Sequence, residues 1–438
     1  MKGIFDTLIN AVKLPELRKK LLFTLLILGL YMLGGLVPAP AIDREAFSSI
    51  IQSSWGQLGG LMDIISGGGL YSATIFAMGI TPYINASIII QLLTVVIKPL
   101  EEMAKEGETG RKKMTKITRF LAIGLAVVQS FIFTWSTKEA LIKSLPMVLA
   151  FILVAITFTA GTCFVVWLGE RINEKGIGNG VSLIIFAGIV TRLPQMAVTL
   201  LSKSQTISGY LKSPVLGTIL GILLFVVATL VSVAIIIFVI YVQNAERRIT
   251  VQYSKKTVGR KTYGGQNSYI PIKINQSGVM PVIFTMSIMS LFSIIISIFF
   301  SGPDNVVGKL AKDFNESPFY YVFYVVLVLL FTFFYSLIQF NPIEISNSIQ
   351  RSGGFIPGIR PGKPTSEFIR VTAMRLCWID GLFLSIVCLV PTIVGTLTGL
   401  ENVWFAGTSV LILTGVANDL VRQIESQLVT RNYRGFLD

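Results

Sequence analysis

The chain has 438 residues, of which 53% are hydrophobic and 14% charged, and its formal net charge is +14. Soluble domains carry about 25% charged residues, so this composition is typical of a membrane protein with several spans. Histidine is absent and only three cysteines occur, at positions in or beside apolar segments. The commonest general base and transition-metal ligand are therefore missing, so we expect neither an enzyme nor a bound cofactor.

Ten apolar segments follow one another along the chain. Crossing ~30 Å of hydrocarbon takes about 20 helical residues. The fifth segment is short by this rule, so we expect it to continue through Pro194 toward Thr199. The segments run over 21–38, 73–97, 120–135, 147–169, 179–191, 213–243, 277–300, 319–340, 376–398 and 403–421.

Positive charge is concentrated in alternate connecting stretches. Of the 37 Lys and Arg residues, 29 lie in the N-terminal stretch and every second one after it. This asymmetry predicts that these stretches and both termini are cytoplasmic. It also leaves a cationic face that could bind a soluble partner or anionic lipid.

The apolar cores are almost free of ionisable residues. The exceptions are Arg375, Asp380 and Asp419, which we expect to reach the interface from cytoplasmic ends. Ion-coupled transporters usually keep a charged residue near the midplane. The pattern therefore favours a conduit driven from outside the chain, with a small-solute secondary transporter as the alternative.

The stretch 56–72 interrupts the pattern, since it is apolar in parts but holds six glycines and Asp63. It is too short to cross a bilayer. One interpretation is an external loop with a short amphipathic helix. The other is a re-entrant segment, which is allowed at membrane depth where protein or water surrounds it.

The second apolar segment has polar residues and a proline. Pro82 predicts a kink, because proline removes a backbone hydrogen bond. Asn85, Ser87 and Gln91 predict a polar seam between helices. Ile80 and Ile84 share one helix face, as do Ile185 and Ile189 in the fifth segment. Such pairs are by default ordinary packing residues.

Three basic stretches lie on the predicted cytoplasmic face. Residues 246–273 alternate apolar and polar positions, which predicts a hairpin. Residues 353–365 form a loop rich in proline and glycine that presents Arg360, and Pro361 and Pro364 are expected to prevent a following helix. The stretch 98–119 has a similar exposed character. Binding of anionic lipid is one interpretation, and docking of a large acidic or RNA-containing partner is the one we favour.

Several strings, taken in order, resemble the bacterial SecY family, whose members are the central subunit of the Sec protein-conducting channel. They are IFAMGITPYINASIIIQLL, KEGETGRKK, GERINEKGIGNGVSLIIFAGIV, the hairpin end YIPIKIN, SGVMPVIF, GGFIPGIRPGKPT, GTSVLI and YRGF. The resemblance implies an all-α polytopic membrane protein, with ten transmembrane helices in two pseudo-symmetric halves and a re-entrant plug helix. Such a channel moves unfolded secretory polypeptides across the bacterial cytoplasmic membrane and releases apolar segments laterally into lipid.

The resemblance also implies roles for individual residues. The apolar pore ring would comprise Ile80, Ile84, Ile185, Ile189, Ile283 and Ile412. The stretch 56–72 would be the plug, with Leu61, Met62, Ile64, Ile65, Gly67 and Gly68. The lateral gate would include Asn85, Gln91 and Leu291, and the contacts to SecA or the ribosome would be Arg260 and Arg360.

The resemblance further implies a division of the chain and a set of partners. Residues 1–20 would be an amphipathic cytoplasmic segment, 21–200 one half, 201–424 the other half with cytoplasmic loops 246–273 and 341–370, and 425–438 a cytoplasmic tail. The implied partners are SecE, SecG, the SecA motor, the ribosome, and an unfolded preprotein or its signal peptide. ATP hydrolysis would belong to SecA.

Overall fold

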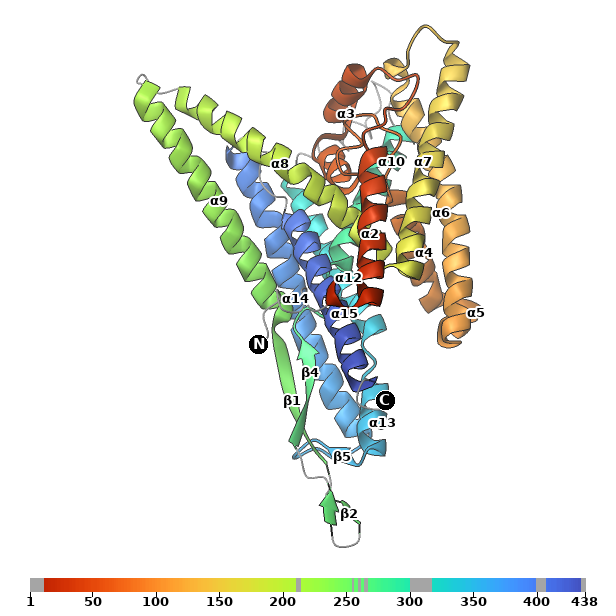
Figure 1. The fold of residues 1–438 in the computed structure, drawn as a ribbon, viewed down its shortest axis with the longest axis vertical. Coiled ribbons are helices and arrows are strands. Elements are labelled where there is room, and N and C mark those ends of the chain that lie inside the picture. The colour runs from red at the N-terminus through yellow and green to blue at the C-terminus, as the bar shows by residue number, and fades with distance from the viewer. Residues whose placement is uncertain are drawn as a thin grey trace.

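The computed structural model describes residues 12–209, 214–253, 256–258, 261–263, 267–299, 317–398 and 407–434, and these are mostly helical (Figure 1). Up to residue 209 the elements are α2 (Pro15–Gly34), α3 (Arg44–Ile65), α4 (Thr81–Val96), α5 (Lys98–Lys105), α6 (Glu108–Ser136), the 3-10 helix η1 (Lys138–Ala140), α7 (Met147–Lys175) and α8 (Gly180–Gly209). From residue 214 the helices are α9 (Pro214–Asn244), α10 (Met280–Phe299), α12 (Pro318–Gln339), α13 (Pro342–Arg351), α14 (Lys363–Thr398) and α15 (Gly407–Arg434). The strands are β1 (Glu246–Tyr253), β2 (Lys256–Val258), β3 (Lys261–Tyr263), β4 (Asn267–Lys273) and β5 (Gly354–Phe355).

Each apolar segment predicted from the sequence lies largely within a helix. The fifth continues past Pro194 as predicted, because α8 runs through this residue. By length and apolar character, four helices in the described part of the chain could cross a bilayer, and α4 with α5, bent by 102°, would make a fifth. The four are Glu108–Ser136, Met147–Lys175, Phe319–Arg351 and Lys363–Val390. Shorter apolar helices lie within α8, α9 and α10.

Two prolines begin helices instead of disrupting them. The kink expected at Pro82 is wrong, since Pro82 lies in the first turn of α4. Pro364 lies in the first turn of α14, so the helix that we expected the prolines to prevent does follow. The first N–H groups of a helix have no partner within it, so proline is tolerated there. The bend in this region comes instead at Ile97, between α4 and α5.

The described residues are not purely helical as the sequence predicts, because they also form small sheets. β1 pairs antiparallel with β4, with Ile249 opposite Ile270, which confirms the predicted hairpin. β5 adds to β1 with Phe355 opposite Gln252, and β2 pairs with β3. Figure 1 shows the strands extending beyond the helices at the end where α13 lies, with α3 at the opposite end. The stretch 98–119 is helical, in α5 and the start of α6, and is no irregular loop.

Two buried clusters hold the helices together. The larger one draws residues from α2, α4, α7 and α8 and from α10, α12, α14 and α15. The second packs α3, α6 and α7 around Phe47, Phe133 and Phe158, which are all within ring contact of one another. α10 contacts both α4 and α6. The larger cluster therefore joins the early and late helices of the chain.

Candidate functional site

Six isoleucines singled out in the sequence converge in the larger cluster. They are contributed by the start of α4 and by α8, α10 and α15, which are far apart in the sequence. Each is at most 6% exposed. They are Ile80, Ile84, Ile185, Ile189, Ile283 and Ile412. Helices from both ends of the chain thus contribute branched apolar side chains to one buried cluster.

The end of α3 lies beside these isoleucines. Ile65 belongs to the same cluster and Ile64 packs against it, whereas Met62 packs against the second cluster. Leu61 lies on α3, one position before Met62. Residues 56–65 of the stretch 56–72 are the end of a longer helix, because α3 already begins at Arg44, where the Asp43 side chain accepts hydrogen bonds from the first turn.

A tight turn follows α3 and touches α8. Gly67 and Gly68 have φ angles of 69° and 90°, a region that glycine adopts without strain. A Cβ on Gly67 would lie 2.9 Å from the Cα of Gly188 on α8, so the two backbones are in contact. The Tyr31 hydroxyl of α2 donates a hydrogen bond of 3.2 Å to the Ser66 carbonyl. The turn is thus held between α2 and α8.

Asp63 and Arg192 form an ion pair between α3 and α8 that the sequence analysis missed. The Asp63 side chain is fully buried and that of Arg192 is 19% exposed. The other carboxylate oxygen of Asp63 accepts a 2.8 Å hydrogen bond from the Tyr71 backbone N–H, and the Arg192 guanidinium lies 6.0 Å from the Tyr71 ring centroid. The one sequence signal is that Arg192 follows Ile189 by three positions, and so lies near it on the same helix face.

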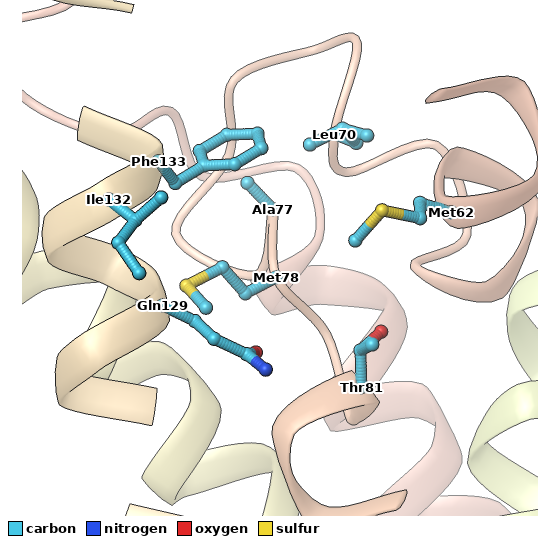
Figure 2. Close-up of a pocket in the computed structure, with 8 residues that line it drawn as sticks. All are labelled: Met62, Leu70, Ala77, Met78, Thr81, Gln129, Ile132 and Phe133. Carbon is cyan, nitrogen blue, oxygen red and sulfur yellow. The ribbon is translucent and has the colours of Figure 1, made fainter. Parts of the chain in front are cut away.

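A cavity of about 10 Å³ separates the turn from α6 (Figure 2). This space suffices for about one water molecule. The Gln129 side chain is 5% exposed, and its Nε2 has no hydrogen-bond partner among the described residues. Figure 2 shows the Gln129 amide directed toward Met78 and Thr81. The lining residues are Met62, Leu70, Ala77, Met78, Thr81, Gln129, Ile132 and Phe133.

The three predicted gate residues lie on helices that contact each other, α4 and α10. Asn85 is 1% exposed, and neither polar atom of its side chain has a partner within the described structure. Gln91 is half-buried and donates a 3.4 Å hydrogen bond to Ser87 on the same helix. Leu291 lies on α10. Thus the predicted polar seam does not form a hydrogen bond across the two helices among these residues.

Asp380 behaves differently from the prediction. Its side chain is fully buried and accepts a 2.7 Å hydrogen bond from Ser277, which lies just before α10. The adjacent Gln276 accepts a 2.9 Å hydrogen bond from Ser336 on α12. The expectation that Asp380 reaches the interface is therefore wrong, because a buried carboxylate here gains a donor from another element. Arg375 and Asp419 are exposed.

The loop after β5 carries Arg360, one of the two predicted partner contacts. Arg360 is exposed, and its backbone carbonyl accepts a 2.8 Å hydrogen bond from Thr365, which closes the loop onto the start of α14. Arg260 lies outside the described residues. On β1, Arg248 donates a 2.8 Å hydrogen bond to Glu246, and its guanidinium lies 4.7 Å from the ring centroid of Tyr269 on β4.

Comparison with known proteins decides the family. A SecY family profile matches residues 74–421. The chain is 42% identical over 440 residues to the protein translocase subunit SecY of Thermus thermophilus, covering 98% of this chain and 96% of the relative. It is 40% identical over 453 residues to that of Streptomyces galbus, covering 98% of each. The chain belongs to the SecY family.

Solved structures agree with this assignment at the level of the fold. A structure described as a protein-conducting channel matches with a TM-score of 0.64 at 18% identity, covering 94% of this chain and 93% of the other. Another, a SecY protein whose plug domain is described as stabilising the closed state and maintaining a membrane seal, has a TM-score of 0.62 at 18% identity and the same coverage. Sec61 in a canine ribosome–channel complex matches with a TM-score of 0.60 at 17% identity, again over 94% and 93%.

The sequence resemblance is therefore confirmed. As a SecY-family chain, this protein is the protein-conducting channel subunit of the Sec translocon, a multi-pass bacterial membrane protein and not an enzyme. Family membership removes the alternative of a small-solute transporter. Its fold is that of SecY channels, mostly helical with several apolar spans.

Proposed function

We propose that the six buried isoleucines seal the channel and that the segment 56–72 is its plug. The observation that supports this most is their convergence: four helices from distant parts of the sequence bring these side chains into one buried cluster, and Ile65 at the end of α3 belongs to it. A narrow apolar ring excludes water and ions by dewetting. It places no demand on the sequence of an extended polypeptide that passes through.

The arrangement across the membrane is also part of this proposal. Ten spans would form two halves, 21–200 and 201–424, with both termini on the cytoplasmic side, flanked by the segment 1–20 and the tail 425–438. The distribution of Lys and Arg supports this orientation. The β1–β4 hairpin and α13 lie together at the end opposite α3 (Figure 1), which fits a cytoplasmic platform at one end and the plug at the other.

Lateral release is assigned to the side where the second and third spans, α4 and α6, face the seventh and eighth, α10 and α12; α10 contacts both α4 and α6. Apolar segments of a substrate would leave between these helices, past Asn85, Gln91 and Leu291. The unpartnered amide of Asn85 supports this role, since a buried polar group without a partner weakens the closed contact.

The basic loops 246–273 and 341–370, with Arg260 and Arg360, would receive SecA or the ribosome. SecE, SecG and anionic lipid would complete the assembly, and a signal peptide would open it.

Paired substitutions to asparagine test the seal. Ile84→Asn with Ile185→Asn puts two amides into the proposed ring, so we expect water to enter it and the resting ion conductance in planar bilayers to rise, while preprotein translocation persists. Ile88→Asn with Ile172→Asn is the matched control, because both residues are at most 3% exposed in the same cluster but are not ring members. Equal conductance of the ring variant and the wild type would refute the assignment.

A further inference from the structure

The Asp63–Arg192 ion pair ties the end of α3 to α8 at the point where the proposed plug meets the proposed ring. Arg192 follows Ile189 by less than one helical turn, so both side chains project from the same side of α8. Gly188, next to Ile189, is in backbone contact with Gly67 of the turn. The ion pair therefore lies beside the ring.

Close backbone approach is what allows this pair to form. A Cβ on Gly68 would lie 2.9 Å from the Arg192 Nε, so a larger residue at this position would displace the guanidinium. The Tyr71 N–H bonds to the second carboxylate oxygen of Asp63 at 2.8 Å. One carboxylate thus holds both the turn that follows it and a side chain of α8.

Because the ion pair is buried, separating its two charges raises the free energy of any state in which α3 has moved away from α8. Two charges removed from water are stable together but costly apart, because removing one partner leaves an uncompensated buried charge. If α3 moved away from α8 without rehydration, Asp63 and Arg192 would each lose their counter-charge. The pair therefore favours the state in which the turn lies against α8.

We propose that Asp63 and Arg192 are a positioning pair that holds the plug against the ring and sets the threshold for opening. The proposal rests on the assignment of 56–72 as the plug. It assigns Arg192, outside the predicted ring, plug and gate, a role in gating. A weaker pair should let the channel open more often at rest and accept substrates with weaker signal sequences.

The two partners should not be equivalent. Asp63 is fully buried, while the Arg192 side chain retains 19% exposure. Arg192→Gln strands a carboxylate with no access to water, whereas Asp63→Asn leaves an arginine that can still be hydrated. We therefore expect Arg192→Gln to raise the resting open probability by about tenfold or more, and Asp63→Asn to raise it less.

The experiment compares resting conductance in planar bilayers and translocation of a preprotein with a defective signal sequence, using the complete channel in vesicles. The variants are Arg192→Gln, Asp63→Asn, the double variant and Arg192→Lys. The double variant removes both charges, so its conductance should fall below that of Arg192→Gln, a non-additive result that loss of structure would not produce. Arg192→Lys should restore much of the wild-type closure.

Arg119→Gln is the matched control, since Arg119 forms an ion pair of 2.6 Å with Glu170 between α6 and α7, away from the turn; it should leave conductance unchanged. Wild-type conductance in Arg192→Gln at normal membrane levels, or additive effects in the double variant, would overturn the proposal. If Arg192→Gln does not accumulate, the resting conductance of Asp63→Asn is compared with that of Arg192→Lys. Higher conductance in Asp63→Asn supports the proposal, and equal conductance in the two variants overturns it. A failure of the plug assignment itself would appear separately, as unchanged conductance when the segment is deleted.

Discussion

At the scale of single residues, several glycines mark points where backbones touch. Gly161 on α7 is one, because a Cβ there would collide with the backbone carbonyl of Ile75 in the segment before α4. The neighbouring Phe76 is 1% exposed and stacks on Tyr31 of α2 with ring centroids 5.8 Å apart. Gly161 therefore allows the segment between the turn and α4 to lie flat against α7.

Gly161→Ala should destabilise the protein although alanine is the better helix former. The added methyl group must displace backbone, and overpacking of this kind costs about 1–3 kcal/mol. Gly124→Ala on α6 is the control, since a Cβ there meets nothing within 4 Å and should stabilise by about 0.5–1 kcal/mol. Thermal unfolding in detergent measures both. Equal midpoints for the two variants would contradict the close contact at Gly161.

At the scale of elements, the last residues of α3 and the turn after it can be removed while Phe47 and Ile51, through which α3 packs in the second cluster, remain in place. α6 contacts α7, and α7 contacts α8. These contacts are made by residues outside the turn. Ile65 and Asp63 at the end of α3 touch the larger cluster and α8, and the turn after them contacts α2 and α8 through Ser66 and Gly67.

Deletion of residues 61–68 should therefore leave a channel that inserts and transports but opens spontaneously. The deletion removes Asp63 and the turn together, so the closed state loses its contacts and the open population rises. Bilayer recordings should show flickering openings, and preproteins with defective signal sequences should be translocated. A variant that no longer reaches the membrane would show instead that the segment is required for folding.

Elements differ in how far the sequence predicts them. Long apolar runs predict helices well, and the alternating pattern of 246–273 predicts the hairpin, because each pattern follows from local geometry. The predictions of a kink at Pro82 and of no helix at Pro364 were wrong. Proline disrupts the interior of a helix but is tolerated in its first turn, so the effect depends on where the first turn starts. The start of α3 at Arg44 was missed because its first turns are polar and resemble a loop.

The candidate site is less accessible from sequence. Isoleucine pairs spaced four apart are common in any buried helix, and only the resemblance to a family singled out six of them. Asp63 and Arg192 lie far apart in the chain, and no local pattern links them. The same is true of Ser277 and Asp380, whose 2.7 Å contact joins two distant elements. Tertiary pairing of this kind depends on how helices pack, which single-sequence patterns do not contain.

At the scale of the whole molecule, positive charge and exposed loops gather at one end. The hairpin, α5, α13 and the loop after β5 lie toward this end (Figure 1). The side chain of Arg360 forms no ion pair with the described residues. Its replacement should therefore affect a partner and not the fold.

Arg360→Glu should accumulate normally and keep wild-type resting conductance, yet fail in SecA-driven translocation. A desolvated arginine contact contributes ~2–5 kcal/mol at an interface, so its reversal should reduce coupling more than about tenfold. Vesicles supplied with SecA and ATP give the rate. Arg44→Glu is the control, an equal charge change on an exposed residue at the opposite end of the molecule. Wild-type rates for Arg360→Glu would mean that the loop is merely solvated surface.

The two-residue strand β5 has a consequence for any partner that binds this end. By pairing with β1, it joins the loop of Arg360 to the hairpin, and Ile249, Ile349, Ile356 and Ile369 form a common core beneath them. The hairpin and the loop of Arg360 are thus ordered relative to each other when the chain folds. A partner that contacts both therefore loses no further conformational entropy by ordering one against the other on binding. Because α14 begins at Lys363, directly after the loop, and its Ile369 belongs to the same core, a partner bound at the hairpin is also connected to the start of this helix.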